Sequence, residues 1–216
     1  MYKYVIFDLD GTLLNTLDDL ADAGNYTCRH YGWPEHPVEA YKYFVGNGMP
    51  KLVERFTPED QRAPEILKAA LDVFVPYYNT HKEDKTVPYA GVPEMLERLR
   101  MAGVQMAVLT NKAHPLAQDV MERYFPGMFH FVQGALPDKP AKPDPTLLRG
   151  LMERMGAKEE ETLFVGDSNV DIRTARNGGL TSCGVLWGFR TARELTLEGA
   201  DHLAENPEQL TELILR

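Results

Sequence analysis

Short, continuously apolar segments alternate with helical patterns along this chain, and that alternation restricts the fold more than any other feature. A strand that is apolar on both faces is buried on both faces, as in a parallel sheet covered by helices. The sequence therefore predicts an α/β fold built on a doubly wound parallel sheet. The apolar segments lie at 4–8, 105–110, 129–134, 161–167 and 181–187, with a weaker one at 201–204.

The helices between these segments have recognisable ends. One pattern over 93–103 has Pro93 in its first turn and Gly103 at its end, and a second over 143–157 ends near Gly156. Proline suits the first turn of a helix and glycine its end. Because repeated strand–helix units bind ligands at the carboxyl ends of their strands, we expect the functional residues at that edge of the sheet.

A long stretch after the first apolar segment interrupts the alternation, because it contains no strand pattern. Its segments 17–32, 50–56 and 64–81 have the apolar spacing of amphipathic helices. An insert of this size is too large for a simple crossover. We expect a small helical cap domain over 15–86, hinged over the strand ends of a catalytic α/β core formed by 1–14 and 87–216.

Length and charge exclude several classes of protein. The chain has 216 residues, enough for one domain with an insert, and a formal net charge of −9. No basic arm or stripe stands out, which argues against a nucleic-acid scaffold. An acidic protein that acts on an anion must concentrate positive charge locally, through a metal ion, a lysine or a helix N-terminus.

Cysteine use and the length of the apolar segments indicate where the protein works. Cys28 and Cys183 form neither a CxxC pair nor a disulfide ladder, so we expect buried thiols in a reducing compartment. No apolar run reaches the roughly eighteen residues of a membrane span, and the first residues lack the apolar core of a signal peptide. We expect a cytoplasmic monomer or small homo-oligomer with no membrane or nucleic-acid partner.

The first apolar segment ends in the sequence FDLDGT, with Asp8 and Asp10 on the same side of the strand. Gly11 then permits a sharp turn. Two carboxylates this close need a cation or a shared proton, and Mg²⁺ is a hard cation that prefers carboxylate oxygens. A single aspartate at this position could simply cap a turn, but the pair at the end of an apolar strand favours a functional site.

A second acidic strand end follows at GDSNVD. Asp167 comes directly after an apolar segment, and Asp171 lies at the start of the next helix. Asp167 or Ser168 could cap that helix, and Asp171 would suit its positive end. For Asp171 both interpretations can hold, whereas for Asp167 we favour a metal shared with Asp8.

Candidate phosphate-binding groups lie near two further strand ends. Thr110 and Asn111 end the second apolar segment in LTNK, where hydroxyl, amide and backbone N–H donors can hold phosphate oxygens. Lys142, between prolines ahead of a helix, could neutralise an anion. Each signal is weak alone, but carboxylates, donors and lysine at successive strand ends together predict a metal-assisted phosphate site.

These motifs resemble those of the haloacid dehalogenase superfamily of phosphatases. FDLDGTLLNT is similar to its first motif, LTNK to its second, the lysine of AKPDP to its third, and VGDSNVDIRTARNGG to its fourth. The segments PYAGVPEMLERLRMAGVQMAVLTNK and GVLWGFRTARELTLEGADHL resemble the phosphoglycolate phosphatase branch. The resemblance covers essentially the whole chain; Asn15 departs from it, because relatives often have aspartate there.

The resemblance implies a catalytic role for the two aspartates of the first motif. Asp8 would be the nucleophile that forms an aspartyl-phosphate. Asp10 would be the general acid for the leaving alcohol and then the base for the hydrolytic water. Thr110 and Lys142 would hold the phosphoryl oxygens, with Asn111 nearby.

The resemblance also implies Mg²⁺ as the cofactor. Asp8, the backbone carbonyl of Asp10, and Asp167 would hold the ion, while Asp171 would support them through water or through Lys142. The ion would offset the charge that keeps one anion from attacking another.

A small phosphorylated metabolite is the expected substrate, with 2-phosphoglycolate as the leading candidate. A phosphosugar mutase of the beta-phosphoglucomutase kind, or a pyrophosphatase, would use the same motifs. A dehalogenase is disfavoured because that chemistry has no use for Asp10. A module that binds a phosphometabolite without turnover is disfavoured because every catalytic position is filled.

The loop VGNGMPK (45–51) of the expected cap has two interpretations. Its spacing does not match a nucleotide-binding loop. It is either a turn whose Pro50 opens a helix or a loop that reaches the site and selects the substrate. In the second case Lys42, Lys51 and Arg55 are candidates for binding a substrate carboxylate.

Overall fold

The computed structural model describes all 216 residues, which form two compact units. The first unit comprises Met1–Leu14 with Pro88–Arg216, and the second comprises Asn15–Val87. The expected division differs from this one only at Val87. Both crossing points contribute to a small two-stranded sheet of β2 (Leu14–Asn15) and β3 (Val87–Pro88).

A six-stranded sheet in the order β5-β4-β1-β6-β7-β8 forms the centre of the first unit. All neighbouring strands are parallel. The order is doubly wound, since the chain builds outward from β1 in both directions. The predicted fold class is therefore confirmed. The strands are β1 (Tyr4–Phe7), β4 (Gln105–Ala113), β5 (Phe131–Ala135), β6 (Thr162–Gly166), β7 (Thr181–Val185) and β8 (His202–Ala204).

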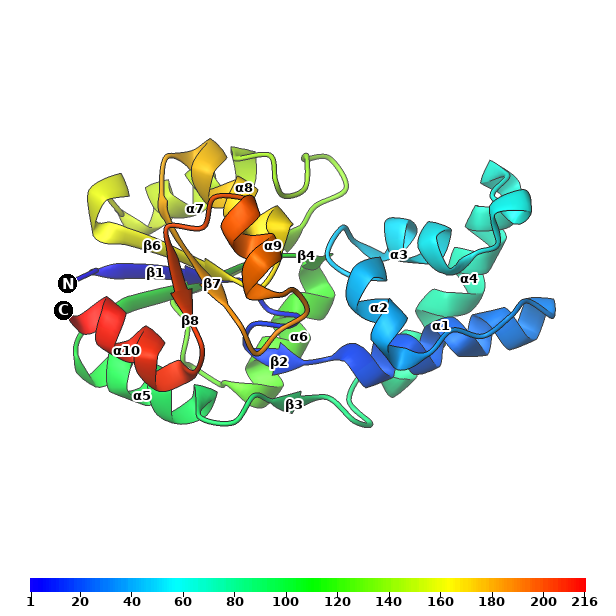
Figure 1. Ribbon diagram of the computed structural model, residues 1–216, viewed down its shortest axis with the longest axis horizontal. Helices are drawn as coiled ribbons and strands as arrows, with labels where there is room; N and C mark the ends of the chain where they lie inside the picture. Colours follow the sequence, from blue (N-terminus) through cyan, green and yellow to red (C-terminus); the bar gives the residue numbers. More distant parts are fainter. The chain divides into compact units, whose positions relative to one another are not determined.

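Helices cover both faces of this sheet (Figure 1). Ile6 of β1 packs into the cluster under α7 and α8, whereas the next residue, Phe7, packs into the cluster under α5, α6 and α10. Burial of successive residues on opposite faces explains why the strands are apolar at every position. The helices are α5 (Val92–Met101), α6 (His114–Tyr124), α7 (Thr146–Met155), α8 (Asn169–Gly178), α9 (Ala192–Leu197) and α10 (Pro207–Leu215), with a 3₁₀ turn at Glu159–Glu161.

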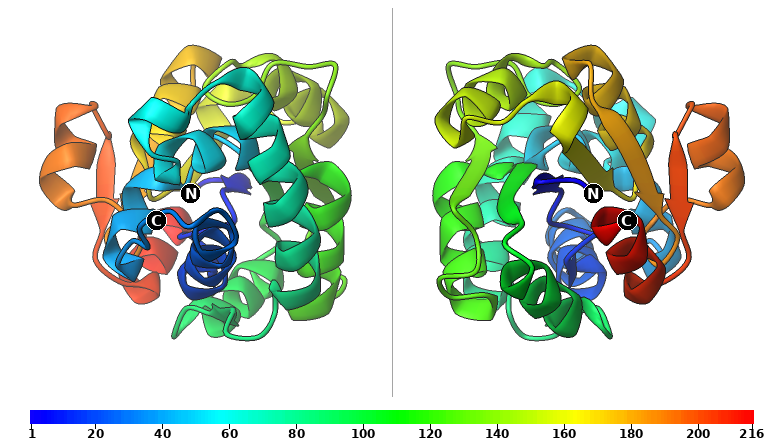
Figure 2. Two further views of the ribbon diagram at one scale, coloured as in Figure 1. Left: turned by 90° about the vertical axis from the view of Figure 1, so that its right-hand side faces the viewer. Right: turned by 90° about the vertical axis from the view of Figure 1, so that its left-hand side faces the viewer.

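The two chain ends lie side by side on the first unit (Figures 1 and 2). The Tyr2 backbone N–H donates to the Ile214 carbonyl oxygen at 2.9 Å. Met1 leads into the amino end of β1, so the carboxyl ends of the parallel strands face the opposite edge. No helix combines the length and the apolar character needed to cross a membrane. Cys28 and Cys183 are both buried, unpaired thiols, as expected.

The second unit is helical. Three of its four α-helices match the predicted segments, but α2 was not predicted because it is short and lies between Pro37 and an extended Val45. Tyr41 anchors α2 in the unit's core, where it is fully buried and donates from its hydroxyl to Asn25 Oδ1 at 3.0 Å. The helices are α1 (Leu17–Tyr31), α2 (Val38–Phe44), α3 (Met49–Phe56) and α4 (Pro64–His81), with a 3₁₀ turn at Glu59–Gln61.

Asp19 joins the two ends of the second unit to each other. Its carboxylate, 1% exposed, accepts from the backbone N–H of Lys85 at 3.0 Å and of Thr86 at 2.8 Å. The Thr86 hydroxyl also donates to Asp19, at 2.7 Å. One side chain in the first turn of α1 therefore satisfies three donors of the segment that leads back to β3.

Candidate active site

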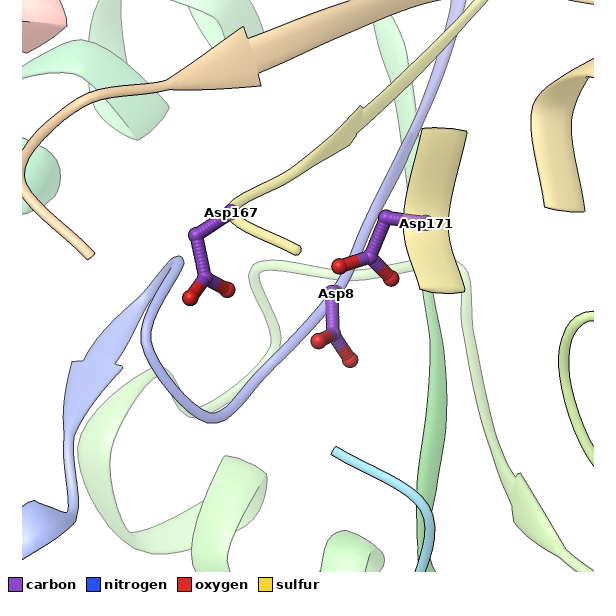
Figure 3. Close-up of side chains that lie close together, drawn as sticks. All are labelled: Asp8, Asp167 and Asp171. Carbon is purple, nitrogen blue, oxygen red and sulfur yellow. The ribbon is translucent and has the colours of Figure 1, made fainter. Parts of the chain in front are cut away.

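Three buried carboxylates converge at the carboxyl edge of the sheet (Figure 3). Asp8 directly follows β1, Asp167 directly follows β6, and Asp171 lies in the first turn of α8. One ligand atom from each lies within 4.8 Å of the others. The neighbouring central strands β1 and β6 thus bring together residues that are far apart in the sequence.

Lys142 is the cation that faces this acidic cluster. Its Nζ lies 2.9 Å from Asp8 Oδ1 and 2.7 Å from Asp171 Oδ1, and the side chain is almost fully buried. A single ammonium opposite three carboxylates leaves negative charge uncompensated when all three are ionised. The cluster is therefore short of positive charge in a largely buried part of the protein.

The shortage of positive charge changes the pKa values of side chains in the cluster. Burial, followed by the charge of Asp171, raises the pKa of Asp8, although Lys142 opposes the shift. Burial and the charges of Asp171 and Asp8 likewise raise the pKa of Asp167. For Lys142, burial alone would lower the pKa, but the carboxylates of Asp171 and Asp8 outweigh it and raise the pKa. The lysine therefore stays charged while the carboxylates compete for protons.

Asp171 has both a structural and an electrostatic role. Its Oδ2 accepts from Ser168 N at 3.0 Å and from Ser168 Oγ at 2.7 Å, which closes the N-terminus of α8 with a capping box. Its Oδ1 accepts from Lys142. Both oxygens are thus engaged by protein donors, one of them Lys142, and the supporting role of Asp171 in metal binding stays a prediction.

Asp167 is held by the loops after β1 and β7. Thr12 Oγ1 donates to its Oδ1 at 2.9 Å, and the Phe189 backbone N–H donates to its Oδ2 at 2.9 Å. Trp187 ties the two loops together, because its indole Nε1 donates to the Thr12 carbonyl at 2.9 Å. Each Asp167 oxygen accepts one hydrogen bond from the protein and keeps a lone pair for another partner.

Two glycines allow this close approach. Gly11 has φ +89°, which L side chains rarely adopt, and a Cβ there would fall 2.8 Å from Asp167 Oδ1. A Cβ at Gly188 would fall 2.6 Å from Asp167 Cγ. The expected sharp turn at Gly11 is present, and its role is to bring the backbone against Asp167.

Thr110 and Asn111 lie in the last part of β4, where its register with β5 shifts between Leu109 and Ala113. Asn111 holds the lysine segment, since its Nδ2 donates to the Lys142 carbonyl at 3.1 Å and its Oδ1 accepts from Lys142 N at 2.9 Å. The Thr110 hydroxyl accepts from the Lys112 backbone N–H at 3.2 Å. The structure thus gives Asn111 a contact with Lys142, and the phosphate contacts of both residues stay predictions.

Asp10 contacts a second buried lysine. Lys112 Nζ donates to Asp10 Oδ1 at 2.9 Å and to Asp10 Oδ2 at 3.1 Å. The side chain of Lys112 is 3% exposed and that of Asp10 is 14% exposed. Asp10 therefore forms an ion pair with Lys112 and is not one of the three clustered carboxylates of Asp8, Asp167 and Asp171.

The donor set fits a divalent cation. Carboxylate oxygens are the preferred ligands of a hard ion such as Mg²⁺. Asp8 Oδ1 is buried and accepts no hydrogen bond of good geometry, although the Lys142 ammonium lies beside it. A divalent ion between Asp8 and Asp167 would supply the positive charge that the cluster lacks.

The three cationic residues proposed to bind a substrate carboxylate, if the loop 45–51 reaches the site, have partners within the second unit. Arg55 donates to the Phe44 carbonyl and to Asn47 Oδ1, both at 2.8 Å. Lys51 pairs with Glu54, and Lys42 pairs with Glu39. Pro50 lies in the first turn of α3, as the turn interpretation predicts. A contact of these residues with substrate stays a prediction.

Several site residues were not identified from the sequence. Lys112 could have been, because it directly follows Thr110 and Asn111 at a strand end. Thr12 belongs to the DGT sequence, but its bond to Asp167 depends on the fold of a distant segment. Trp187 and Phe189 follow β7, a further strand that ends at the same edge of the sheet. That position was their only signal.

Comparisons with known proteins place this chain beside a described family and named relatives. The sequence model of the haloacid dehalogenase-like hydrolase family matches residues 5–185. A phosphoglycolate phosphatase of Vibrio parahaemolyticus serotype O3:K6 is 32% identical over 220 residues, which cover 98% of this chain and 96% of that protein.

Solved structures extend the comparison to the fold. A crystal structure of a candidate phosphoglycolate phosphatase from Lactobacillus delbrueckii subsp. bulgaricus has a TM-score of 0.91 and 34% identity, covering 99% of this chain and 98% of that one. A candidate beta-phosphoglucomutase from Bacteroides vulgatus has a TM-score of 0.79 and 21% identity, covering 98% of this chain and 86% of that one. At that identity the second likeness concerns the fold alone.

Proposed function

The chain belongs to the haloacid dehalogenase-like hydrolase family and is a phosphatase, and we propose that it hydrolyses small phosphomonoesters with Mg²⁺ through an aspartyl-phosphate on Asp8. One observation carries the proposal: Asp8, Lys142 and Asp167 meet in one buried cluster. The leading substrate is 2-phosphoglycolate. The similarity to the phosphoglycolate phosphatase of Vibrio parahaemolyticus supports that choice.

Asp8 and Asp10 divide the chemistry between them. A carboxylate oxygen of Asp8 forms a bond to phosphorus while the bond from phosphorus to the leaving oxygen breaks, and Asp10 gives that oxygen its proton. A water molecule then attacks the phosphorus of the aspartyl-phosphate and loses a proton to Asp10, which frees phosphate and restores Asp8. Splitting hydrolysis into these two steps is the usual advantage of a covalent nucleophile.

The other site residues bind the phosphoryl group and the metal ion. Lys142 neutralises charge beside Asp8, and the Thr110 hydroxyl, which accepts from Lys112 N, has its own hydrogen available for a phosphoryl oxygen. Asp8, Asp167 and the backbone carbonyl of Asp10 would hold Mg²⁺. When bound, the ion offsets the repulsion between a carboxylate and a phosphate.

A panel of phosphate esters tests the proposal. We expect Mg²⁺-dependent release of phosphate from 2-phosphoglycolate, and loss of at least about 1,000-fold in turnover for Asp8→Asn. Asp10→Asn should also lose most turnover. Asp119→Asn, at an exposed position of α6, is the matched control and should behave like the wild type. Near-normal turnover by a folded Asp8→Asn variant would refute the nucleophile assignment.

The same panel separates the alternatives. A sugar monophosphate that is converted to its isomer, with a bisphosphate retained during turnover, would identify a phosphosugar mutase. Preference for inorganic pyrophosphate would identify a pyrophosphatase. Mg²⁺-dependent release of phosphate from p-nitrophenyl phosphate would exclude a module that binds a phosphometabolite without turnover.

A further inference from the structure

Lys112 has no role in the chemistry described so far, although it is one of two lysines buried at the site. Its ammonium contacts both carboxylate oxygens of Asp10, at 2.9 Å and 3.1 Å. A contact to both oxygens by one cation restricts the rotation of the carboxyl group as well as its position. Burying a lysine costs free energy unless its charge is paired. The ion pair with Asp10 therefore compensates for the burial of Lys112.

The backbone of Lys112 links the same pair to the phosphate-binding segment. Its N–H donates to the Thr110 hydroxyl at 3.2 Å. Asp10 is therefore oriented by a side chain whose backbone also orients Thr110. Lys142 contacts Asp8 and Asp171, and Lys112 contacts Asp10.

We propose that Lys112 is a positioning residue that aims Asp10 at the leaving oxygen and stabilises the negative charge left on Asp10 once its proton is transferred. This role rests on the proposed phosphatase function. In the step concerned, the bond from Asp8 to phosphorus forms, the bond from phosphorus to the leaving oxygen breaks, and the Asp10 proton moves to that oxygen. Lys112 keeps its own protons throughout and acts by charge.

Leaving-group dependence distinguishes this role from a general loss of structure. An alkyl alcohol needs a proton in order to leave, whereas p-nitrophenolate leaves without one. The quantity to compare is kcat/KM, because it reports only the steps up to departure of the leaving group. For Lys112→Met we expect kcat/KM to fall about 100-fold with 2-phosphoglycolate or glycerol phosphate, and less than about 5-fold with p-nitrophenyl phosphate. Lys112→Arg, which keeps the charge, should recover much of the loss.

A matched control and a double variant complete the experiment. Lys139→Met removes an exposed lysine and should leave both kcat/KM values unchanged. Lys112→Met combined with Asp10→Asn leaves no unpaired buried charge at this position, so it should fold even if the single variant does not. On the alkyl ester its kcat/KM should match that of Asp10→Asn alone, because Lys112 acts only through Asp10.

The possible results separate the two hypotheses. Equal losses on both esters, or a further loss in the double variant beyond Asp10→Asn, would overturn the positioning role and leave the phosphatase function in place. A wild-type protein inactive on every ester would overturn the proposed function and this role with it.

Discussion

Gly188 lies so close to Asp167 that its replacement by alanine tests how the loop after β7 positions a predicted metal ligand. The added Cβ would fall 2.6 Å from Asp167 Cγ and would also collide with Asp167 Cβ and the Gly11 carbonyl oxygen. Real Cβ atoms essentially never approach within 3.0 Å. Because Asp167 is fixed by hydrogen bonds and the second obstacle is backbone, the segment 187–189 must move. That movement would break the bond from Phe189 N to Asp167.

These contacts determine how much free energy of unfolding the Gly188→Ala variant should lose. Overpacking a well-filled site costs about 1–3 kcal/mol, and loss of a hydrogen bond to a charged group costs about 1.5–3 kcal/mol. Because one loop movement causes both, we expect a combined loss of about 2–4 kcal/mol. In a protein of this length that lowers the Tm by roughly 5–15 °C. Misplacing Asp167 should also raise the Mg²⁺ concentration for half-maximal activity about 10- to 100-fold.

Thermal unfolding and a Mg²⁺ titration of phosphatase activity measure both effects. Gly150→Ala is the matched control, because a Cβ at Gly150 in α7 meets nothing within 4 Å. Alanine is the better helix former by about 1 kcal/mol, so this control should unfold at a slightly higher temperature than the wild type. If Gly188→Ala unfolded like the wild type and needed no more Mg²⁺, the loop would not position Asp167.

Two further predictions concern the acidic cluster and the second unit. Burial and neighbouring charge raise the pKa of Asp8 and Asp167 above the ordinary 3.8, so the metal-free fold binds more protons than the unfolded chain and loses stability as the pH rises above that value. Since Mg²⁺ binds the deprotonated carboxylates, it should raise the Tm more at about pH 8 than at about pH 6, and an equal rise at both would argue against this cation site. Asp19→Ala leaves three donors of Lys85 and Thr86 without their acceptor and should cost about 2–4 kcal/mol in thermal unfolding. Asp18→Ala, in the same turn of α1, should cost less than about 1 kcal/mol, and equal losses would exclude a special role for Asp19.

The sheet could be predicted because strands that are buried on both faces have a recognisable apolar sequence pattern. Ile6 and Phe7 pack on opposite faces, so a strand reads as an unbroken apolar run that is hard to mistake for a surface strand. The short helix α2 could not be predicted in the same way. Its seven residues are too few for a clear helical period, and Tyr41 is buried by contacts with α1 and α3 that no local pattern specifies.

The candidate site was only partly predictable. The strand ends predict which carboxylates can meet, because parallel strands end at one edge. They do not predict how each carboxylate is held. The bonds from Thr12 and Phe189 to Asp167, and from Asn111 to the Lys142 backbone, join segments that are distant in the sequence. Their existence depends on loop paths and side-chain reach, which the fold as a whole determines.

The position of β1 in the middle of the sheet has a consequence for the protein's synthesis. The ribosome makes Asp8 long before Asp167 and Phe189, which complete its surroundings. Contacts between such distant residues form late in folding. A growing or prematurely terminated chain that ends before β6 has the first aspartate and no assembled centre. We therefore expect enzymatic activity only after the chain has been synthesised through Phe189 and has folded.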